Sequence, residues 1–143
     1  MRRSTTLLYD VPAEVAFDYL SDPTHRPEWQ SSLRRVEVLD PGPAHDGQRW
    51  LDHTAVGLVA AMRTTAYAPA TEWSETGTWR GIAADLTLRF EPHGSGCRVH
   101  AEFSVHGRGA WSAIGVAATT VGLPAVRADL ATAGRILSER HHP

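Results

Sequence analysis

Residues 11–29 read VPAEVAFDYLSDPTHRPEW, and this stretch predicts an amphipathic helix, a break and a short second helical segment. Pro12 suits the first turn of a helix, because the N–H that proline lacks would have no partner there. Val15, Phe17 and Leu20 recur at helical spacing and form one apolar face. The stretch ends on a tryptophan after a proline-containing break. The rest of the predicted fold is arranged around this helical pair.

The segments on either side of this block predict strands. One strand precedes it at residues 4–10, and turns rich in glycine and proline separate the strands that follow. These later strands are predicted at residues 33–40, 48–55, 58–67, 71–79, 82–91 and 97–105. Short strands joined by short turns are typical of an antiparallel meander.

A long C-terminal helix is predicted from about residue 110, where apolar residues begin to recur every three or four positions. Gly122 and Pro124 fall inside this pattern. Because a proline inside a helix removes one backbone hydrogen bond, we expect a kink or a break there. A sheet with one apolar face must bury that face against another element, so we expect this helix to lie across the sheet.

The opening block resembles the start of the START-like superfamily, also called SRPBCC, which includes polyketide cyclases and dehydratases, pollen-allergen-like proteins and lipid-transfer domains. The matching positions are Pro12, Ala13, Glu14, Ala16, Phe17, Asp22, Pro23 and Trp29. Later landmarks that match are Gly47, residues 67–69, 90–92 and 96–99, and the terminal helix. The resemblance implies one START-like domain over residues 1–143. It also implies an α+β helix-grip fold: a curved antiparallel sheet of about six or seven strands, two short helices after the first strand, and a long C-terminal helix packed across the sheet.

Composition narrows the classes of function. The formal net charge of −2 gives no sign of a nucleic-acid partner. All fourteen basic residues are arginine, which excludes a Schiff-base lysine and a P-loop lysine. Cys97 is the only cysteine, so an internal disulfide and a cysteine-based metal site are excluded as well. No metal-ligand spacing occurs, and we expect neither a metal nor a cofactor.

Two segments bear on location. Asp10 and Glu14 interrupt the apolar run that a signal peptide would need, so a cytoplasmic protein is expected. Residues 109–126 carry no charge and approach the length of a membrane span, but their many small residues favour a buried core helix. The expected partner is a small hydrophobic ligand, with no nucleic acid and no membrane span, and the chain is expected to be a monomer or a homodimer.

The space between sheet and helix is either a filled core or a ligand cavity. Small residues on both walls fit either alternative, and the family resemblance favours a cavity. Five tryptophans point the same way, because tryptophan often lines apolar ligand sites. The family motif places Trp29 near the mouth of the cavity. The residues expected to bind the ligand are Trp29, Trp50, Met62, Trp73, Trp79, Phe90, Phe103, Trp111 and Ile114.

Glu75 is the leading candidate for acid–base chemistry. It shares strand parity with Trp73 and Trp79, so it faces the cavity if those rings do. A carboxylate in an apolar pocket has a raised pKa and can act as a general acid or base in enolisation, aldol closure or dehydration. The alternative is that Glu75 pairs with an arginine or lies at a solvated strand end.

Asp52 and His53 are the second candidates, and they point to opposite faces of one strand. Asp52 shares its parity with Trp50, and only one of the two sets can face inward. We favour the face with Trp50 and Asp52, and keep His53 as an acid–base candidate because its ordinary pKa lies near neutrality. Arg63 is expected outside, since the same reasoning puts Met62 inside.

The sequence thus leaves three hypotheses. The first is a cofactor-free cyclase or dehydratase of secondary metabolism that acts on a polyketide- or lipid-like molecule. The second is a protein that binds or carries a hydrophobic ligand without changing it, and the third is an interaction protein with a closed core. Polar groups converging on a pocket favour the first, and an apolar pocket favours the second.

Overall fold

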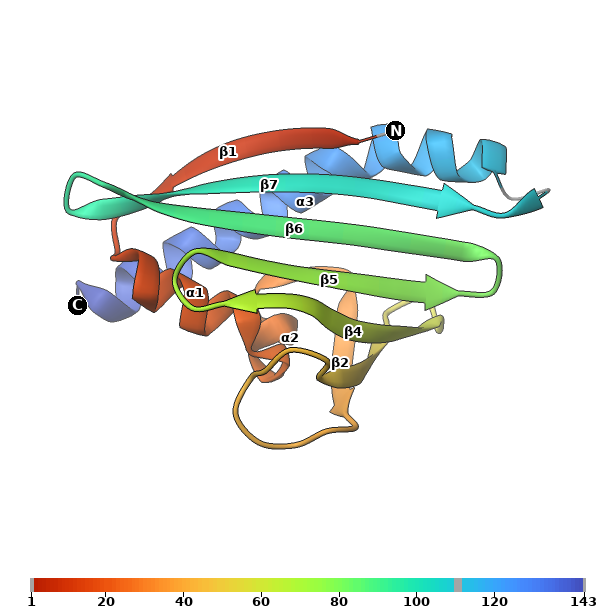
Figure 1. The fold of residues 1–143 in the computed structure, drawn as a ribbon, viewed down its shortest axis with the longest axis horizontal. Helices are drawn as coiled ribbons and strands as arrows, with labels where there is room; N and C mark the ends of the chain where they lie inside the picture. The colour runs from red at the N-terminus through yellow and green to blue at the C-terminus, as the bar shows by residue number, and fades with distance from the viewer. Residues whose placement is uncertain (1, 110–111, 143) are drawn as a thin grey trace.

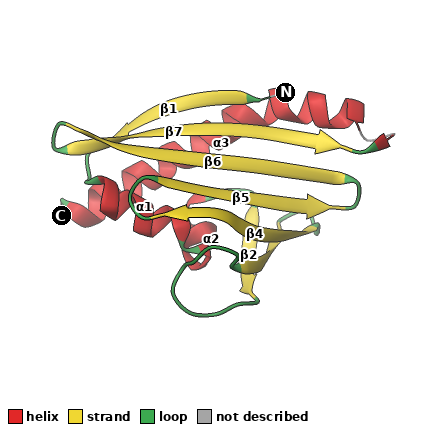
Figure 2. Ribbon diagram, in the orientation of Figure 1, coloured by secondary structure: helices red, strands yellow, loops and turns green. Residues whose placement is uncertain are grey.

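The computed structural model describes residues 2–109 and 112–142, with the backbone alone for residues 112–121. Seven strands form one antiparallel sheet in the spatial order β1-β7-β6-β5-β4-β3-β2, and helices lie on one side of it (Figures 1 and 2). The elements in chain order are β1 (Arg3–Tyr9), α1 (Ala13–Ser21), η1 (Pro23–His25), α2 (Arg26–Trp29), β2 (Leu33–Val38), β3 (Arg49–Thr54), β4 (Val59–Ala68), β5 (Glu72–Trp79), β6 (Ile82–His93), β7 (Gly96–Gly107) and α3 (Ser112–His141).

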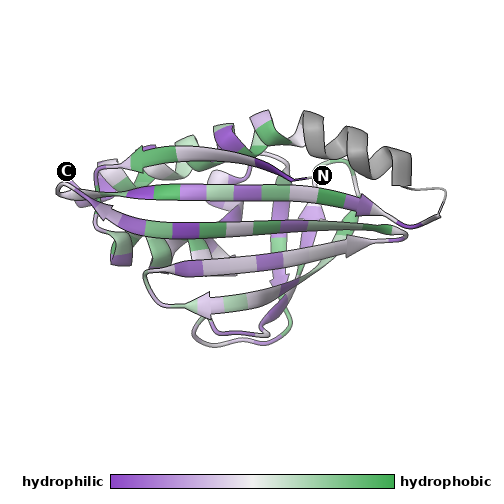
Figure 3. Ribbon diagram, turned by 45° about the horizontal axis from the view of Figure 1, so that its top comes forward, coloured by the Kyte–Doolittle hydropathy of each residue, from purple (hydrophilic) through white to green (hydrophobic). Residues whose placement is uncertain are grey.

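The predicted architecture is confirmed. The fold is the α+β helix grip, with α3 running diagonally across the sheet and the short helices near its C-terminal end (Figure 1). In the same view β2 runs steeply across the direction of the long strands β5, β6 and β7, so the sheet is strongly curved. Hydrophobic and hydrophilic residues alternate along the long strands, as a sheet with one buried face requires (Figure 3).

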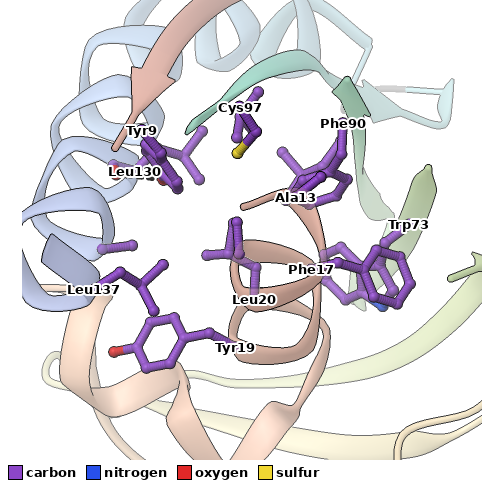
Figure 4. Packing of buried hydrophobic residues seen from close by; sticks show 14 of the residues in the cluster. Tyr9, Ala13, Phe17, Tyr19, Leu20, Trp73, Phe90, Cys97, Leu130 and Leu137 are labelled. Atoms are coloured by element: carbon purple, nitrogen blue, oxygen red, sulfur yellow. Dashed lines mark hydrogen bonds between the residues drawn. The ribbon is translucent and has the colours of Figure 1, made fainter. Parts of the chain in front are cut away.

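The dense part of the core lies between α1, the C-terminal half of α3 and the adjoining strands (Figure 4). Phe17 of α1 packs edge to face on Phe90, with 5.4 Å between ring centroids. Tyr9 at the end of β1 donates a hydrogen bond of 2.6 Å to the Leu130 carbonyl, which ties the first strand to α3. Burial of side chains of this size contributes about 1.5–3 kcal/mol each.

Helix α2 is held in place from both sides. Upstream, the Asp22 side chain accepts hydrogen bonds from the backbone N–H and the hydroxyl of Thr24, which caps the turn that leads into α2. Glu28 accepts hydrogen bonds from Tyr19 at 2.9 Å and from Arg140 at 3.1 and 3.2 Å. Residues on α1 and α3 therefore fix the direction in which the remaining α2 side chains point.

Helix α3 continues through Pro124, so the expected break between Gly122 and Pro124 does not occur, and a kink there stays a prediction. The cost of a proline inside a helix, about 3 kcal/mol, is offset by packing of the helix on the sheet. Gly122 belongs to that packing, because a Cβ atom there would lie 2.7 Å from the Phe103 ring. None of the helices in the described part of the chain combines the length and the hydrophobicity of a membrane span.

Candidate functional site

A cavity of about 250 Å³ lies between the end of α2, the concave face of the sheet and the middle of α3. Its walls are mostly apolar, with aromatic rings on two sides and small residues on α3. The described residues that line it are Trp29, Gln30, Ser32, Met62, Glu75, Ala84, Asp85, Leu86, Phe103, Gly122, Ala125, Val126 and Asp129. Of the two alternatives, a filled core or a cavity, the structure has a cavity between the sheet and α3.

Three of the predicted ligand-binding residues, Trp29, Met62 and Phe103, line this cavity. Trp29 is 3% exposed, and its indole N–H has no hydrogen-bond acceptor in the described part of the chain. Cross-strand pairing explains how the sheet makes room for Met62 in the cavity wall. Met62 lies opposite Gly77, where a Cβ atom would come within 2.4 Å of the methionine sulfur, so the absence of a side chain makes room for Met62.

The other predicted lining residues lie elsewhere. Trp50, Trp73 and Phe90 are buried in the packed core and do not line the cavity. Trp50 lies under the Arg26 guanidinium, whose central carbon is 5.1 Å from the ring centroid, and Phe90 packs on Phe17 of α1. Trp79 is half-buried at the end of β5, where the Arg80 guanidinium lies 4.9 Å from its ring centroid. The prediction that Trp50, Trp73, Phe90 and Trp79 line the cavity is therefore corrected. Trp111 and Ile114 lie outside the residues whose side chains the structure describes.

The polar centre of the site is a buried arginine that joins two strands. Arg26 of α2 is 2% exposed and donates to Asp52 from Nε at 3.2 Å and from Nη2 at 2.7 Å. Its Nη1 donates to Glu75 Oε2 at 2.7 Å, and Nη2 also donates to Gln30 at 3.3 Å. The Trp50 indole N–H donates to Asp52 at 3.1 Å, which completes the shell around that carboxylate.

Both carboxylates of this cluster face inward, on the same strand faces as Trp50 and Trp73. Asp52 is 4% and Glu75 is 6% exposed, and Glu75 alone of the two lines the cavity. Arg63 is exposed and Met62 inside, as expected. His53 lies on the opposite face of β3, where its Nε2 is 3.4 Å from Glu37, so it does not reach the cavity.

The cluster has one cation for two carboxylates, and the pKa of Glu75 within it is raised. Burial raises the pKa of Glu75, the Arg26 charge works against that rise, and the Asp52 charge adds to it, with a resulting pKa of about 7. Burial alone would lower the pKa of Arg26, but the attraction of Glu75 and Asp52 outweighs it and raises that pKa. A carboxyl that titrates near neutrality therefore stands at the wall of an apolar cavity.

Arg26 is the residue that sequence reasoning missed. The alternative that Glu75 pairs with an arginine was correct, but the partner could not be identified along the strands. A signal was present nonetheless: two inward carboxylates in an apolar interior require a buried cation, because unpaired buried charges are costly. Arg26 precedes Trp29 by one helical turn, and both side chains point to the sheet. Among the described residues no group of His, Cys, Asp and Glu is arranged to hold a metal ion.

A comparison with protein families finds one match. The model of the family described as "Polyketide cyclase / dehydrase and lipid transport" matches residues 3–137. Among curated proteins, none matches this sequence.

Solved structures similar to this chain share its fold at low sequence identity. The di-domain ARO/CYC BexL from the BE-7585A biosynthetic pathway is 14% identical with a TM-score of 0.79, over 100% of this chain and 48% of that one. Protein MLL2253 from Mesorhizobium loti is 17% identical with a TM-score of 0.73, over 98% of each chain. Ara h 8.0201 is 14% identical with a TM-score of 0.68, over 96% and 98%. Identities this low speak to the fold alone.

Proposed function

Because the chain belongs to the polyketide cyclase / dehydrase and lipid transport family, within the START-like SRPBCC superfamily, we propose that it binds a small hydrophobic molecule in its cavity and acts on it by cofactor-free acid–base chemistry. The observation that carries the proposal is the Glu75 carboxyl, which lines an apolar cavity and has a pKa of about 7. The description of the family supports a polyketide- or lipid-like substrate.

The size of the cavity limits the ligand. Pockets for drug-sized ligands usually measure about 300–1,000 Å³. A cavity of about 250 Å³ fits a compact molecule of one or two rings, or the reacting end of a longer one. Trp29, Met62 and Phe103 supply flat and polarisable contacts that suit a ring system.

Glu75 is the proposed catalytic residue. As a carboxylate it removes a proton from a carbon next to a ketone, and the electrons of the C–H bond form the carbon–carbon double bond of the enolate. The protonated carboxyl then returns that proton to carbon, or delivers it to a departing hydroxyl in a dehydration. A pKa near the working pH keeps both forms of the carboxyl populated, which suits a group that acts in both directions. Asp52 and Arg26 act through Glu75, by setting its charge and position.

The experiment uses 2-tetralone, a compact ketone, and follows exchange of its α-protons for deuterium in D₂O by NMR. We expect the wild-type protein to accelerate exchange and Glu75→Gln to lose at least about tenfold of that acceleration, as loss of a general base typically costs about 10²–10⁴. Glu72→Gln is the matched control, because Glu72 lies on the same strand but half-exposed and paired with Arg89 at 3.1 Å. Unchanged acceleration in Glu75→Gln would remove Glu75 from the mechanism.

The second candidate function is ligand carriage without chemistry, which the mostly apolar wall favours. The same protein samples separate the two. Tryptophan fluorescence should change on addition of 2-tetralone, and Trp29→Phe should lose that change while Trp79→Phe keeps it. Binding without any acceleration of exchange would assign the protein to carriage, and no binding of 2-tetralone or other compact apolar molecules would contradict both candidates.

A further inference from the structure

Two carboxylates that line the cavity, Glu75 and Asp129, each have one oxygen without a hydrogen-bond donor in the part of the chain that the structure describes. Glu75 receives its hydrogen bond from Arg26 at Oε2, and Oε1 accepts none from any described residue. Oε1 is not fully buried, unlike the indole N–H of Trp29. Because the Glu75 side chain lines the cavity, we take this oxygen to face the cavity. Glu75 is 6% exposed, and a buried carboxylate with one oxygen unpartnered calls for a donor from outside the chain.

A second carboxylate lies on the opposite wall. Asp129 of α3 lines the same cavity and accepts hydrogen bonds from Ser31 at Oδ1 alone, at 3.3 Å from the backbone N–H and 3.1 Å from the hydroxyl. Burial raises its pKa, and the Ser31 hydrogen bonds oppose that rise. Its Oδ2 has no donor among the described residues.

No basic side chain of the described residues lines the cavity to balance these groups. Arg26 lies behind Glu75, and the hydrogen bonds from its Nε, Nη1 and Nη2 all end on Asp52, Glu75 or Gln30. Asp85 also lines the cavity, but its carboxylate lies 3.3 Å from His106 and belongs to that pair. The cavity therefore carries excess negative charge on apolar walls.

We propose that the ligand of this cavity carries a protonated amine on a compact aromatic or alicyclic body, and that Glu75 and Asp129 bind the ammonium group. An ammonium supplies three N–H donors, which is enough to give one to the free oxygen of each carboxylate. The rings of Trp29 and Phe103 add attraction for a cation that lies over their faces. A carboxylate ligand such as a fatty acid would meet like charge instead. This inference rests on one part of the proposed function, that the cavity holds a small ligand. Because Glu75 Oε1 cannot hold an ammonium group and remove a proton from carbon at once, an ammonium ligand belongs with carriage rather than with catalysis by Glu75.

The test compares three ligands of one shape: 1-naphthylmethylamine, 1-naphthalenemethanol and 1-naphthoic acid. At pH 7.5 they carry a positive, a neutral and a negative polar group. Isothermal titration calorimetry should give the lowest Kd for the amine, and the amine should bind about tenfold or more tighter than the acid, since hydrogen bonds to a charged group are worth at least one factor of ten. Raising the salt concentration should narrow the gap.

Substitutions of the two carboxylates then test whether they cause the preference for the amine. Asp129→Asn and Glu75→Gln should each reduce the preference for the amine over the alcohol severalfold, while Glu72→Gln should leave it unchanged. Equal binding of the three ligands, or tighter binding of the acid, would overturn the ammonium assignment and leave the ligand-binding cavity standing. Failure of all three ligands to bind would overturn both.

Discussion

At the scale of single residues, Arg26 decides the chemistry of the site. It neutralises Asp52 in a bidentate pair and shares a third hydrogen bond with Glu75, so the excess negative charge rests on the carboxyl at the cavity wall. A buried ion pair of this kind adds little net stability, because desolvation offsets the attraction. Its effect is to fix the geometry and to hold Glu75 near its midpoint of titration at neutral pH.

Replacing Arg26 should therefore lower the stability of the protein strongly. Arg26→Met leaves two carboxylates in the interior without a cation, and we expect a loss of about 3–5 kcal/mol in the free energy of unfolding. Urea denaturation followed by tryptophan fluorescence measures this. Arg49→Met is the matched control, since Arg49 pairs with Asp40 at the surface, and its stability should stay close to that of the wild type. Equal losses in the two variants would contradict the buried cluster.

The titration of Glu75 should appear in the pH dependence of stability. Its pKa in the folded state, about 7, lies above the ordinary glutamate value of 4.5, so the folded state binds the proton more tightly than the unfolded state. The resulting stabilisation is complete below pH 4.5 and is lost as the pH rises through about 7. Its full size is at most about 3 kcal/mol.

Glu75→Gln cannot titrate, so the fall in unfolding free energy between pH 5 and pH 8 should be smaller in this variant than in the wild type. Urea denaturation at four pH values across that interval measures the difference, and Glu72→Gln should keep the wild-type dependence. A variant that loses stability between pH 5 and pH 8 as steeply as the wild type would place the relevant proton elsewhere.

At the scale of elements, the contact of α3 with the sheet depends on glycines. A Cβ atom at Gly134 would lie 2.7 Å from the Tyr9 ring, which is buried and anchored through its hydroxyl to Leu130. Gly122 makes the corresponding approach to Phe103 at the cavity. The helix can pass close to β1 and β7 at these positions because a side chain is missing there.

Gly134→Ala should therefore destabilise the protein. Helix propensity alone would make alanine more favourable by about 1 kcal/mol. The clash with an anchored ring outweighs this, and we expect a net loss of about 1–3 kcal/mol, as in other overpacked cores. Thermal unfolding by circular dichroism measures the change. Ala131→Gly, at an exposed position of the same helix, should lose only the propensity difference, and a rise in stability for Gly134→Ala would refute the close contact.

At the scale of the whole molecule, the interior is divided between a packed region and a cavity. Tyr9, Phe17, Leu20, Leu130 and Leu137 fill the space around α1 (Figure 4). Farther along the sheet the same two layers, β-strands and α3, enclose about 250 Å³. A molecule that fills this space should stabilise the folded state, because binding to the folded chain alone shifts the unfolding equilibrium.

We expect 1-naphthylmethylamine at about 100 times its Kd to add about 2.7 kcal/mol to the unfolding free energy. Differential scanning fluorimetry measures the accompanying rise in Tm. Phe103→Ala, which removes one wall of the cavity, should reduce that rise after correction for the lower stability of the variant. An unchanged rise in Phe103→Ala would place the ligand outside the cavity.

The sequence by itself determined the elements and the faces of the strands. Helical and strand periods are local properties, so seven strands, a helical pair and a terminal helix follow from the spacing of apolar residues. Parity grouped Asp52 with Trp50 and Glu75 with Trp73, and the burial of these tryptophans decides that both carboxylates face inward. Only the tertiary structure decided what those carboxylates meet. Arg26 lies 26 and 49 positions from them, and only the docking of α2 on the curved sheet brings the three side chains together. Likewise, parity cannot tell the cavity from the packed core, since Trp73 and Glu75 share one face and only the course of α1 and α3 above them separates a filled space from an open one.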